Sequence, residues 1–301
     1  MNPAVSRAAS QRLDGAGPSS SNCTIGGSGI REIASFHILF VTLLGALAAA
    51  PALAKDSGPT YGADPADLPA RIDRLVKAYP DTISGVDGNA LVLKDGTRLE
   101  ISDGRSDKSF DELLGSPDVG DMFAFDYPAG APATAPALNF DPGRVRVEAL
   151  FRALYGDCQK GSLAKTRKVP WLPNHGGGSV PFSTAQGADK ALEAVSADLD
   201  QLPKSFMKFL VPSAGTYNCR PIAKTDRMSM HAYAAAIDIN TKQTTYWQWA
   251  KPGADGLYHW SNKIPQEIVA AFEKHGFVWG GRWYHYDTMH FEYRPELLPA
   301  K

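Results

Sequence analysis

The sequence predicts an α+β fold, in which a small antiparallel sheet is flanked by helices and preceded by a small β-rich accessory region. Two observations carry this prediction. Apolar residues recur at helical spacing in four segments, which is typical of amphipathic helices packed on a core. Short β-rich runs, such as residues 236–239, are mixed with a helical pattern in the last hundred or so residues. This mixture is typical of α+β domains.

Four segments are expected to be helical because their apolar residues return every three or four positions. The first is a short helix around Ile72, Leu75, Val76 and Tyr79. The other three segments cover residues 145–155, 188–202 and 265–274. These segments supply the helical part of the predicted fold.

Residues 82–101 are expected to form a β-hairpin or small meander, because apolar and polar positions alternate around two Asp-Gly turns. Pro and Gly are frequent in residues 126–144, and Gly dominates residues 173–178, so both segments are interpreted as loops. We therefore expect a β-rich accessory region at residues 71–144 and the main domain at residues 145–301.

The N-terminal fifth is expected to lie outside the folded domains. Residues 1–30 are rich in Ser, Gly and Ala and lack the apolar periodicity of a packed element. A continuous apolar stretch follows and ends in Ala52-Leu53-Ala54, the layout of a secretory signal peptide with its cleavage site. Residues 1–54 are therefore interpreted as a polar lead and signal peptide, residues 55–70 as a linker, and the protein as exported. The alternative is an uncleaved anchor, which would place the protein at a membrane.

The balance of charges excludes one class of function. The 301 residues include 31 Lys and Arg against 32 Asp and Glu, which gives a formal net charge of −1. A nucleic-acid-binding protein needs a clear basic excess or a basic patch. We therefore expect no nucleic-acid partner.

The sequence has three cysteines, of which Cys23 lies in the segment that is expected to be removed. An oxidising compartment would let the two that remain, Cys158 and Cys219, form a disulfide. The alternative is two unpaired, buried thiols. We expect the disulfide.

His231 and Asp238 are the first candidate metal ligands. Asp238 lies in the apolar run Ala236-Ile237-Asp238-Ile239, where an unpaired carboxylate would be costly to bury. A divalent cation keeps such a carboxylate ionised and also binds an imidazole nitrogen, here that of His231. The alternative for each residue taken alone is structural, since a His is often a hydrogen-bonded core residue and an Asp often caps a turn.

A second segment, residues 280–293, holds two histidines and two carboxylates among aromatic residues. His290, at the expected start of a strand, would complete the two nitrogens and one oxygen that zinc hydrolases use, with a fourth position left for water. Asp287 then becomes the natural acceptor of a proton from that water. Because strand alternation would put positions 287 and 290 on opposite faces, a bend at Thr288-Met289 is expected.

Together these residues resemble a family, the zinc D-Ala-D-Ala carboxypeptidases and dipeptidases and the L-Ala-D-Glu endopeptidases of bacteria and phages. The first motif of the family, Ser-x-His-x-x-Gly-x-Ala-x-Asp, has its matches at Ser229, His231, Ala236 and Asp238. The glycine of the family is replaced by Ala234. The second motif, an acidic residue three positions before the last His ligand, is matched by Asp287 and His290. The resemblance covers roughly residues 200–296.

The resemblance implies that residues 145–301 form a zinc peptidase domain, which cleaves a peptide bond in the stem peptides of bacterial peptidoglycan. One zinc ion per chain would be held by His231, Asp238 and His290, with Asp287 as the catalytic base. The resemblance does not decide which bond is cut, because carboxypeptidases, dipeptidases and endopeptidases share the metal motif. The protein would act in the periplasm or at the cell wall. The alternative is a non-catalytic peptidoglycan-binding protein with a structural zinc.

In this family an Arg that follows an aromatic residue, upstream of the first His ligand, helps to hold the substrate carbonyl or carboxylate. Arg220 is the candidate for this catalytic role and Arg227 is its rival, while a surface salt bridge is the alternative for either. His285 is close enough in sequence to His290 to compete for the metal, but we expect it either to support the ligands from outside the metal's coordination sphere or to contact substrate. The expected substrate contacts are Ser229, Tyr233, Trp283 and His285.

Overall fold

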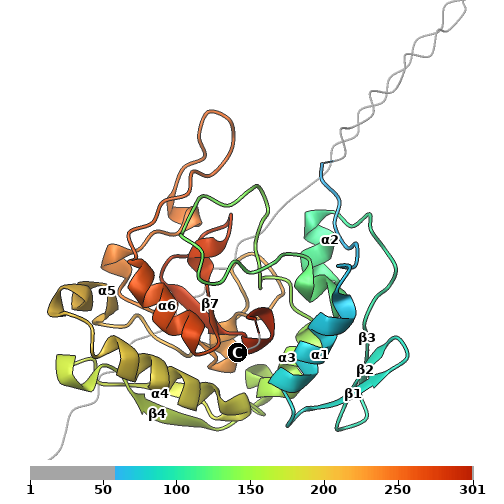
Figure 1. Ribbon diagram of the computed structural model, residues 1–301, viewed down its shortest axis with the longest axis horizontal. Coiled ribbons are helices and arrows are strands. Elements are labelled where there is room, and N and C mark those ends of the chain that lie inside the picture. Colours follow the sequence, from blue (N-terminus) through green and yellow to red (C-terminus); the bar gives the residue numbers. More distant parts are fainter. Residues whose placement is uncertain (1–57, 300–301) are drawn as a thin grey trace, which may run out of the picture. The chain divides into compact units, whose positions relative to one another are not determined.

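The computed structural model describes residues 58–299, which are coloured in Figure 1. The segment interpreted as a polar lead, signal peptide and start of the linker lies outside the described residues, so this interpretation stays a prediction. Within residues 58–299, no helix has the length and apolar character needed to span a bilayer.

Six α-helices lie in this part of the chain. They are α1 (Leu68–Ala78), α2 (Phe110–Gly115), α3 (Glu148–Tyr155), α4 (Ala188–Leu199), α5 (Met207–Leu210) and α6 (Gln266–Lys274). Helices α1, α3, α4 and α6 occur where the apolar spacing predicts helices. The short helix α2 begins at a capping box, in which the Ser109 hydroxyl accepts a hydrogen bond from the backbone N–H of Glu112.

The strands of the described residues form three small antiparallel sheets. The first has the order β1-β2-β3, with β1 (Ile83–Asp87), β2 (Ala90–Leu93) and β3 (Arg98–Glu100). The second pairs β4 (Thr166–Pro170) with β5 (Ser179–Ser183). The third has the order β6-β8-β7, with β6 (Ala236–Asp238), β7 (Phe277–Trp279) and β8 (His290–Tyr293). Helices combined with small antiparallel sheets confirm the α+β class.

The first sheet is the meander that the sequence predicts at residues 82–101. The β4-β5 hairpin, by contrast, is not evident from the sequence, because Pro170 and Pro181 lie within its strands and proline argues against a strand. Residues 173–178, interpreted as a loop, connect these two strands.

The third sheet is held in place by an apolar layer of helices. Helix α6 packs against β7 and against α4, and α4 also packs on β4 (Figure 1). The ring of Phe272 in α6 stacks on that of Phe291 in β8, with their centroids 3.8 Å apart. Both rings are fully buried. Burial of these apolar faces stabilises the strands that carry two of the candidate ligands.

The accessory region and the main domain share one hydrophobic core. Leu75 of α1 and Leu91 of β2 are fully buried in it. Polar contacts reinforce this packing: the Tyr79 hydroxyl donates to the carboxylate of Glu296 at 2.6 Å, and Arg74 Nε donates to the Glu296 carbonyl at 2.8 Å. The accessory region is therefore packed onto the C-terminal segment.

Cys158 and Cys219 form the predicted disulfide. The bridge joins a short 3-10 turn that follows α3 to the loop that precedes His231, across a sequence separation of 61 residues. Because Arg220 directly follows Cys219, the bridge anchors the segment that carries this candidate substrate-binding residue.

Replacing both cysteines, by Cys158→Ser together with Cys219→Ser, is expected to lower the free energy of unfolding by up to about 4 kcal/mol. The reason is that the bridge restricts a loop of 61 residues in the unfolded chain. Urea denaturation of the variant and of the wild type measures the difference. Wild type treated with a reductant should show the same loss, and a midpoint that neither change alters would contradict the expectation.

Candidate metal centre

Three segments position the candidate ligands. His231 lies in the 3-10 turn Met230–Tyr233, which is capped by Ser229, whose hydroxyl accepts a hydrogen bond from the His231 N–H at 3.3 Å. Asp238 ends β6 and His290 begins β8, and the antiparallel register pairs these two residues directly. Side chains of directly paired residues lie on the same face of a sheet, so the backbone itself makes the carboxylate and the imidazole neighbours.

Ala234, which stands where the resembled family has glycine, adopts a left-handed backbone conformation with φ of 51°. Glycine adopts this conformation readily and other residues rarely do, which gives the glycine of the family a conformational explanation. The turn is nevertheless kept here, since the Ala234 N–H donates to the His231 carbonyl at 3.1 Å. The replacement therefore leaves His231 and β6 in place.

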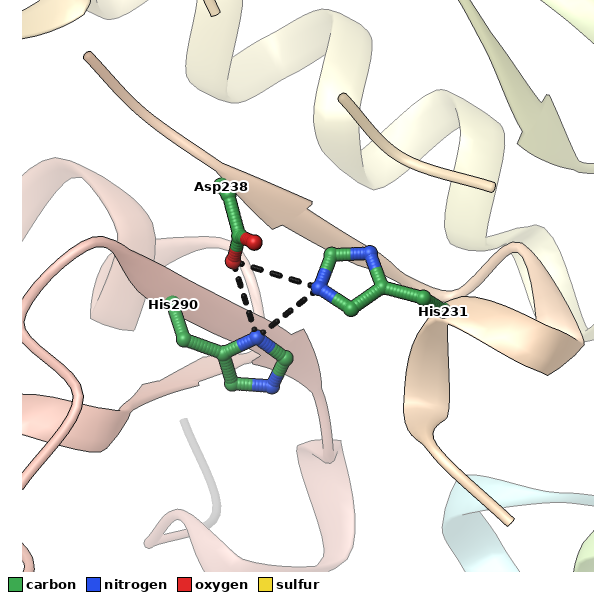
Figure 2. Close-up of side chains that lie close together, drawn as sticks. All are labelled: His231, Asp238 and His290. Atoms are coloured by element: carbon green, nitrogen blue, oxygen red, sulfur yellow. Dashed lines mark hydrogen bonds and ion pairs between the residues drawn. The ribbon is translucent and has the colours of Figure 1, made fainter. Parts of the chain in front are cut away.

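The side chains of His231, Asp238 and His290 converge on one point (Figure 2). Asp238 Oδ1 lies 3.2 Å from His231 Nε2 and 3.0 Å from His290 Nδ1, and the two nitrogens are 3.1 Å apart. Donor atoms held about 2 Å from a tetrahedral zinc ion lie roughly 3.3 Å from one another. The spacing of the three donors thus fits such an ion.

The second nitrogen of each ring has a partner that orients it. His231 Nδ1 lies 3.2 Å from the carbonyl of Thr216, and His290 Nε2 lies 3.1 Å from Glu292 Oε2. With a proton on these outer nitrogens, each ring donates a hydrogen bond outward and turns its other nitrogen toward the shared point. Partners of this kind fix the ring orientation and the tautomer that a metal ligand needs.

Electrostatic interactions shift the pKa values of two of the three candidate ligands. Burial lowers the pKa of His290, but its contacts with Asp238 and Glu292 outweigh burial and raise that pKa to about 10. Burial raises the pKa of Asp238, whereas the charge on His231 and hydrogen bonds from both rings hold it well below its usual range. Asp238 is therefore ionised at neutral pH, as a ligand carboxylate must be.

Glu292 is held in turn by a chain of buried charges. Arg294 Nη1 donates to Glu292 Oε1 at 3.1 Å, and Arg294 Nε donates to Glu296 Oε1 at 2.5 Å. Burial alone would raise the pKa of Glu292, but the hydrogen bond from His290 and the positive charges nearby lower it to about 2. This series of buried charges runs from the candidate metal centre to Glu296, which also accepts a hydrogen bond from the Tyr79 hydroxyl.

Asp287 lies beside this group, across the bend expected at Thr288-Met289. These two residues form a turn, in which the His290 N–H donates to the Asp287 carbonyl at 3.2 Å. Asp287 Oδ1 is buried and has no hydrogen-bond partner. Burial and the negative charge of Asp238 raise the pKa of Asp287 to about 6.

The carboxylate oxygen Oδ1 of Asp287 is unpartnered and lies near two imidazoles and a second carboxylate. This arrangement fits a site that binds a cation better than a hydrophobic core without one. Buried polar atoms are almost always hydrogen-bonded, and two neighbouring carboxylates repel each other. A divalent cation such as zinc would offset the charge of Asp238 and Asp287, and a water molecule would donate to Asp287 Oδ1. The donor set, of one oxygen and two nitrogens, also suits zinc.

These residues line a cavity of about 490 Å³. Its walls include the candidate ligands and base, His231, Asp238, Asp287 and His290. Three of the other predicted site residues also line it, namely Arg220, Ser229 and Trp283. The remaining walls include Arg144, Arg146, Tyr246, Trp249, Met289 and Glu292. The guanidinium of Arg220 makes a hydrogen bond to the Pro221 carbonyl at 3.2 Å and has no ion pair among the described residues. The indole of Trp283 donates to the Pro142 carbonyl at 2.7 Å, which fixes this wall of the cavity.

The structure does not bring the other two predicted substrate contacts into this cavity. Tyr233 is only 2% exposed; it packs beside Phe151 of α3, and its hydroxyl donates to Glu148 at 2.8 Å. The prediction for Tyr233 is corrected, because the turn that presents His231 points Tyr233 into the core. His285 Nδ1 lies 2.7 Å from the buried carboxylate of Asp141, so His285 is not in the ligand group and lines a neighbouring cavity.

Sequence reasoning missed several residues of the site. The sequence could have placed Glu292 at the site, because Glu292 lies two positions after His290 in a strand and therefore on the same face. No local pattern could have placed Arg144 and Arg146 there, since they come from a loop far away in the sequence. Of the two rival arginines, Arg220 lines the candidate metal cavity and Arg227 lines the neighbouring one.

Residues 223–293 match a family model described as D-alanyl-D-alanine carboxypeptidase. The match covers less than a quarter of the chain but includes the three candidate ligands and Asp287. It confirms the resemblance that the motifs indicate and supports a peptidase activity. No curated protein matches the chain significantly.

Glu292→Gln is expected to weaken zinc binding by about 10–100-fold, because the amide no longer holds the His290 ring through a charged hydrogen bond. Competition of the protein with a chromophoric chelator measures the affinity. Glu267→Gln, at an exposed position of α6, is the matched control and should bind zinc as the wild type does. Equal affinities for the two variants, both with native circular dichroism, would contradict the role of Glu292.

Proposed function

Because residues 223–293 match the D-alanyl-D-alanine carboxypeptidase family, we propose that this protein hydrolyses a peptide bond in the stem peptides of bacterial peptidoglycan, with one zinc ion as cofactor. The observation that carries the proposal is the position of Asp287. Its unpartnered carboxylate oxygen is buried in the cavity that the three candidate ligands also line. A potential base beside a potential metal site is the arrangement that metal-assisted hydrolysis needs.

His231 Nε2, Asp238 Oδ1 and His290 Nδ1 would hold the zinc ion, since these are the atoms that converge. A zinc ion supplies Lewis acidity, which lowers the pKa of a water molecule and polarises a carbonyl group. Thr216 and Glu292 keep the two rings in the required orientation through the outer nitrogens.

Asp287 is the general base of the proposed reaction. Its Oδ1 accepts a proton from the attacking water, and the protonated carboxyl then gives that proton to the departing amine. Arg220 lines the same cavity and has no ion pair among the described residues, so its guanidinium is available to stabilise negative charge on the substrate. Trp283 forms a fixed apolar wall that excludes bulk water from one side.

The alternative function is a non-catalytic peptidoglycan-binding protein in which zinc is only a structural clip. Structural zinc sites are closed by four protein ligands, whereas a catalytic site keeps one position open. Among the described residues, three side chains form the candidate group, and beside it the carboxylate oxygen Oδ1 of Asp287 has no hydrogen-bond partner. These observations favour the hydrolase.

We also propose that the protein is exported and works in the periplasm or at the cell wall. The disulfide between Cys158 and Cys219 supports this location, because disulfides persist in oxidising compartments. Peptidoglycan is found in the same location.

Asp287→Asn is expected to lower kcat on a peptide ending in D-Ala-D-Ala, or on purified peptidoglycan, by about 100-fold or more, because an amide cannot accept the proton. Zinc content and thermal stability should stay at wild-type values. Released amino groups and metal analysis provide the measurements, and Asp81→Asn at an exposed position is the matched control. Full activity of Asp287→Asn would disprove its role as the base.

Removal of the metal with a chelator is expected to abolish hydrolysis, and stoichiometric zinc should restore it. His231→Ala should bind zinc weakly and stay inactive when zinc is added. Mass spectrometry of muropeptides after digestion identifies the bond that is cut. Zinc-loaded wild-type protein that leaves peptidoglycan and stem peptides intact would favour the binding protein over the enzyme.

A further inference from the structure

A second cavity, of about 680 Å³, borders the candidate metal cavity. The two share Arg144, Ile222, Ala223 and Gln248 in their linings, so a ligand at the metal centre would extend naturally into the second space. One wall comes from the accessory region, through Phe110 of α2, the helix labelled in Figure 1. All of this wall lies outside the segment that matches the peptidase family, residues 223–293.

The second cavity presents more positive charge than its acids neutralise. Arg144, Lys224 and Arg227 line it. Within residues 58–299, Arg227 has no ion pair, and one of its nitrogens donates to the Arg144 carbonyl at 3.3 Å. Burial, together with the positive charges of Arg146 and Arg144, lowers the pKa of Arg227 to about 10. The negative charges of Glu148 and Asp141 offset this effect only in part.

The acidic groups of the cavity compensate its positive charge only in part. Asp141 is fully buried, and its carboxylate accepts hydrogen bonds from the ring and the backbone N–H of His285, at 2.7 and 3.0 Å. Arg144 Nε lies 3.8 Å from this carboxylate, too far for a hydrogen bond. Asp111 is exposed at the surface of α2. An anion bound in the cavity would therefore gain charge-assisted hydrogen bonds.

The cavity also has a rigid apolar surface beside its cations. The His285 ring stacks on Phe110, with centroids 5.7 Å apart and planes inclined by 17°, and meets the edge of Trp247 at 4.7 Å. Asp141 fixes the ring from the other side. Such a surface holds the apolar parts of a ligand while the cations hold its anionic group.

We propose that this second cavity is a substrate subsite that binds a carboxylate of the stem peptide other than the C-terminal one, through Arg227 and Lys224. The proposal rests on the proposed function, since the ligand extends from a peptide bond placed at the metal centre. The accessory region thereby has a role in substrate selection, because Phe110 and Asp141 build one wall of the subsite.

The test uses two synthetic stem pentapeptides, one with its side-chain and internal carboxyls free and one with those groups as carboxamides. The C-terminal carboxyl is free in both. The full-length, zinc-loaded protein should cleave the carboxyl peptide with a kcat/KM about tenfold or more above that of the amidated peptide. Equal kcat/KM values for the two peptides would overturn the proposal.

Two variants locate the effect in the second cavity. Lys224→Ala, at an exposed position, and Arg227→Gln should each reduce the ratio of kcat/KM for the carboxyl peptide to kcat/KM for the amidated peptide, mainly through a higher KM for the carboxyl peptide. Lys168→Ala, at an exposed position of β4, is the matched control and should retain the preference. A preference that survives both cavity variants would place the carboxylate elsewhere and overturn the assignment.

Failure of the proposed function would be recognised separately. If the protein cleaves neither peptide, calorimetric binding of both peptides to Asp287→Asn protein tests the subsite alone. Tighter binding of the carboxyl peptide, lost in Asp287→Asn/Lys224→Ala, supports the subsite even without hydrolysis. Equal binding of the two peptides, or no binding of either, overturns it.

Discussion

The antiparallel pairing of β6 with β8 is the constraint on which the candidate site depends. It sets Asp238 directly opposite His290, so the distance between the carboxylate and the imidazole follows from backbone hydrogen bonds. His231 joins them from a separate capped turn and is oriented by the Thr216 carbonyl. Ligands that are held in this way need little rearrangement to bind a cation, which keeps the entropic cost of binding low.

Buried charge links this pairing to the rest of the molecule. Glu292, Arg294 and Glu296 are almost completely buried, and each is compensated by the next. Removing one member of such a chain leaves an uncompensated charge in the core, which costs several kcal/mol. Because Tyr79 of the accessory region bonds to Glu296, the support of His290 extends into α1. The accessory region is thus part of the framework that orients the candidate ligand.

The two cavities combine different chemistries in one groove. The first holds the converging candidate ligands and the unpartnered carboxylate oxygen of Asp287, and the second is lined by Lys224 and Arg227, which have no ion pair within residues 58–299. Arg144 lines both cavities, and its guanidinium also lies over the ring of Trp283 at 5.2 Å. A peptide bond in the first cavity and an anionic group in the second would together explain why so many charged side chains line the two cavities.

The candidate site residues His231, Asp238, Asp287 and His290 could be selected from the sequence, because they lie in short motifs that resemble those of a peptidase family. The main helices follow from apolar periodicity, and the disulfide follows from the two cysteines left in the predicted mature chain. Only the tertiary structure decided that Tyr233 faces the core, that Arg220 and Arg227 line different cavities, and that Arg144 reaches the site. The physical reason is that these placements depend on packing between segments far apart in the chain, which no local pattern of residues records.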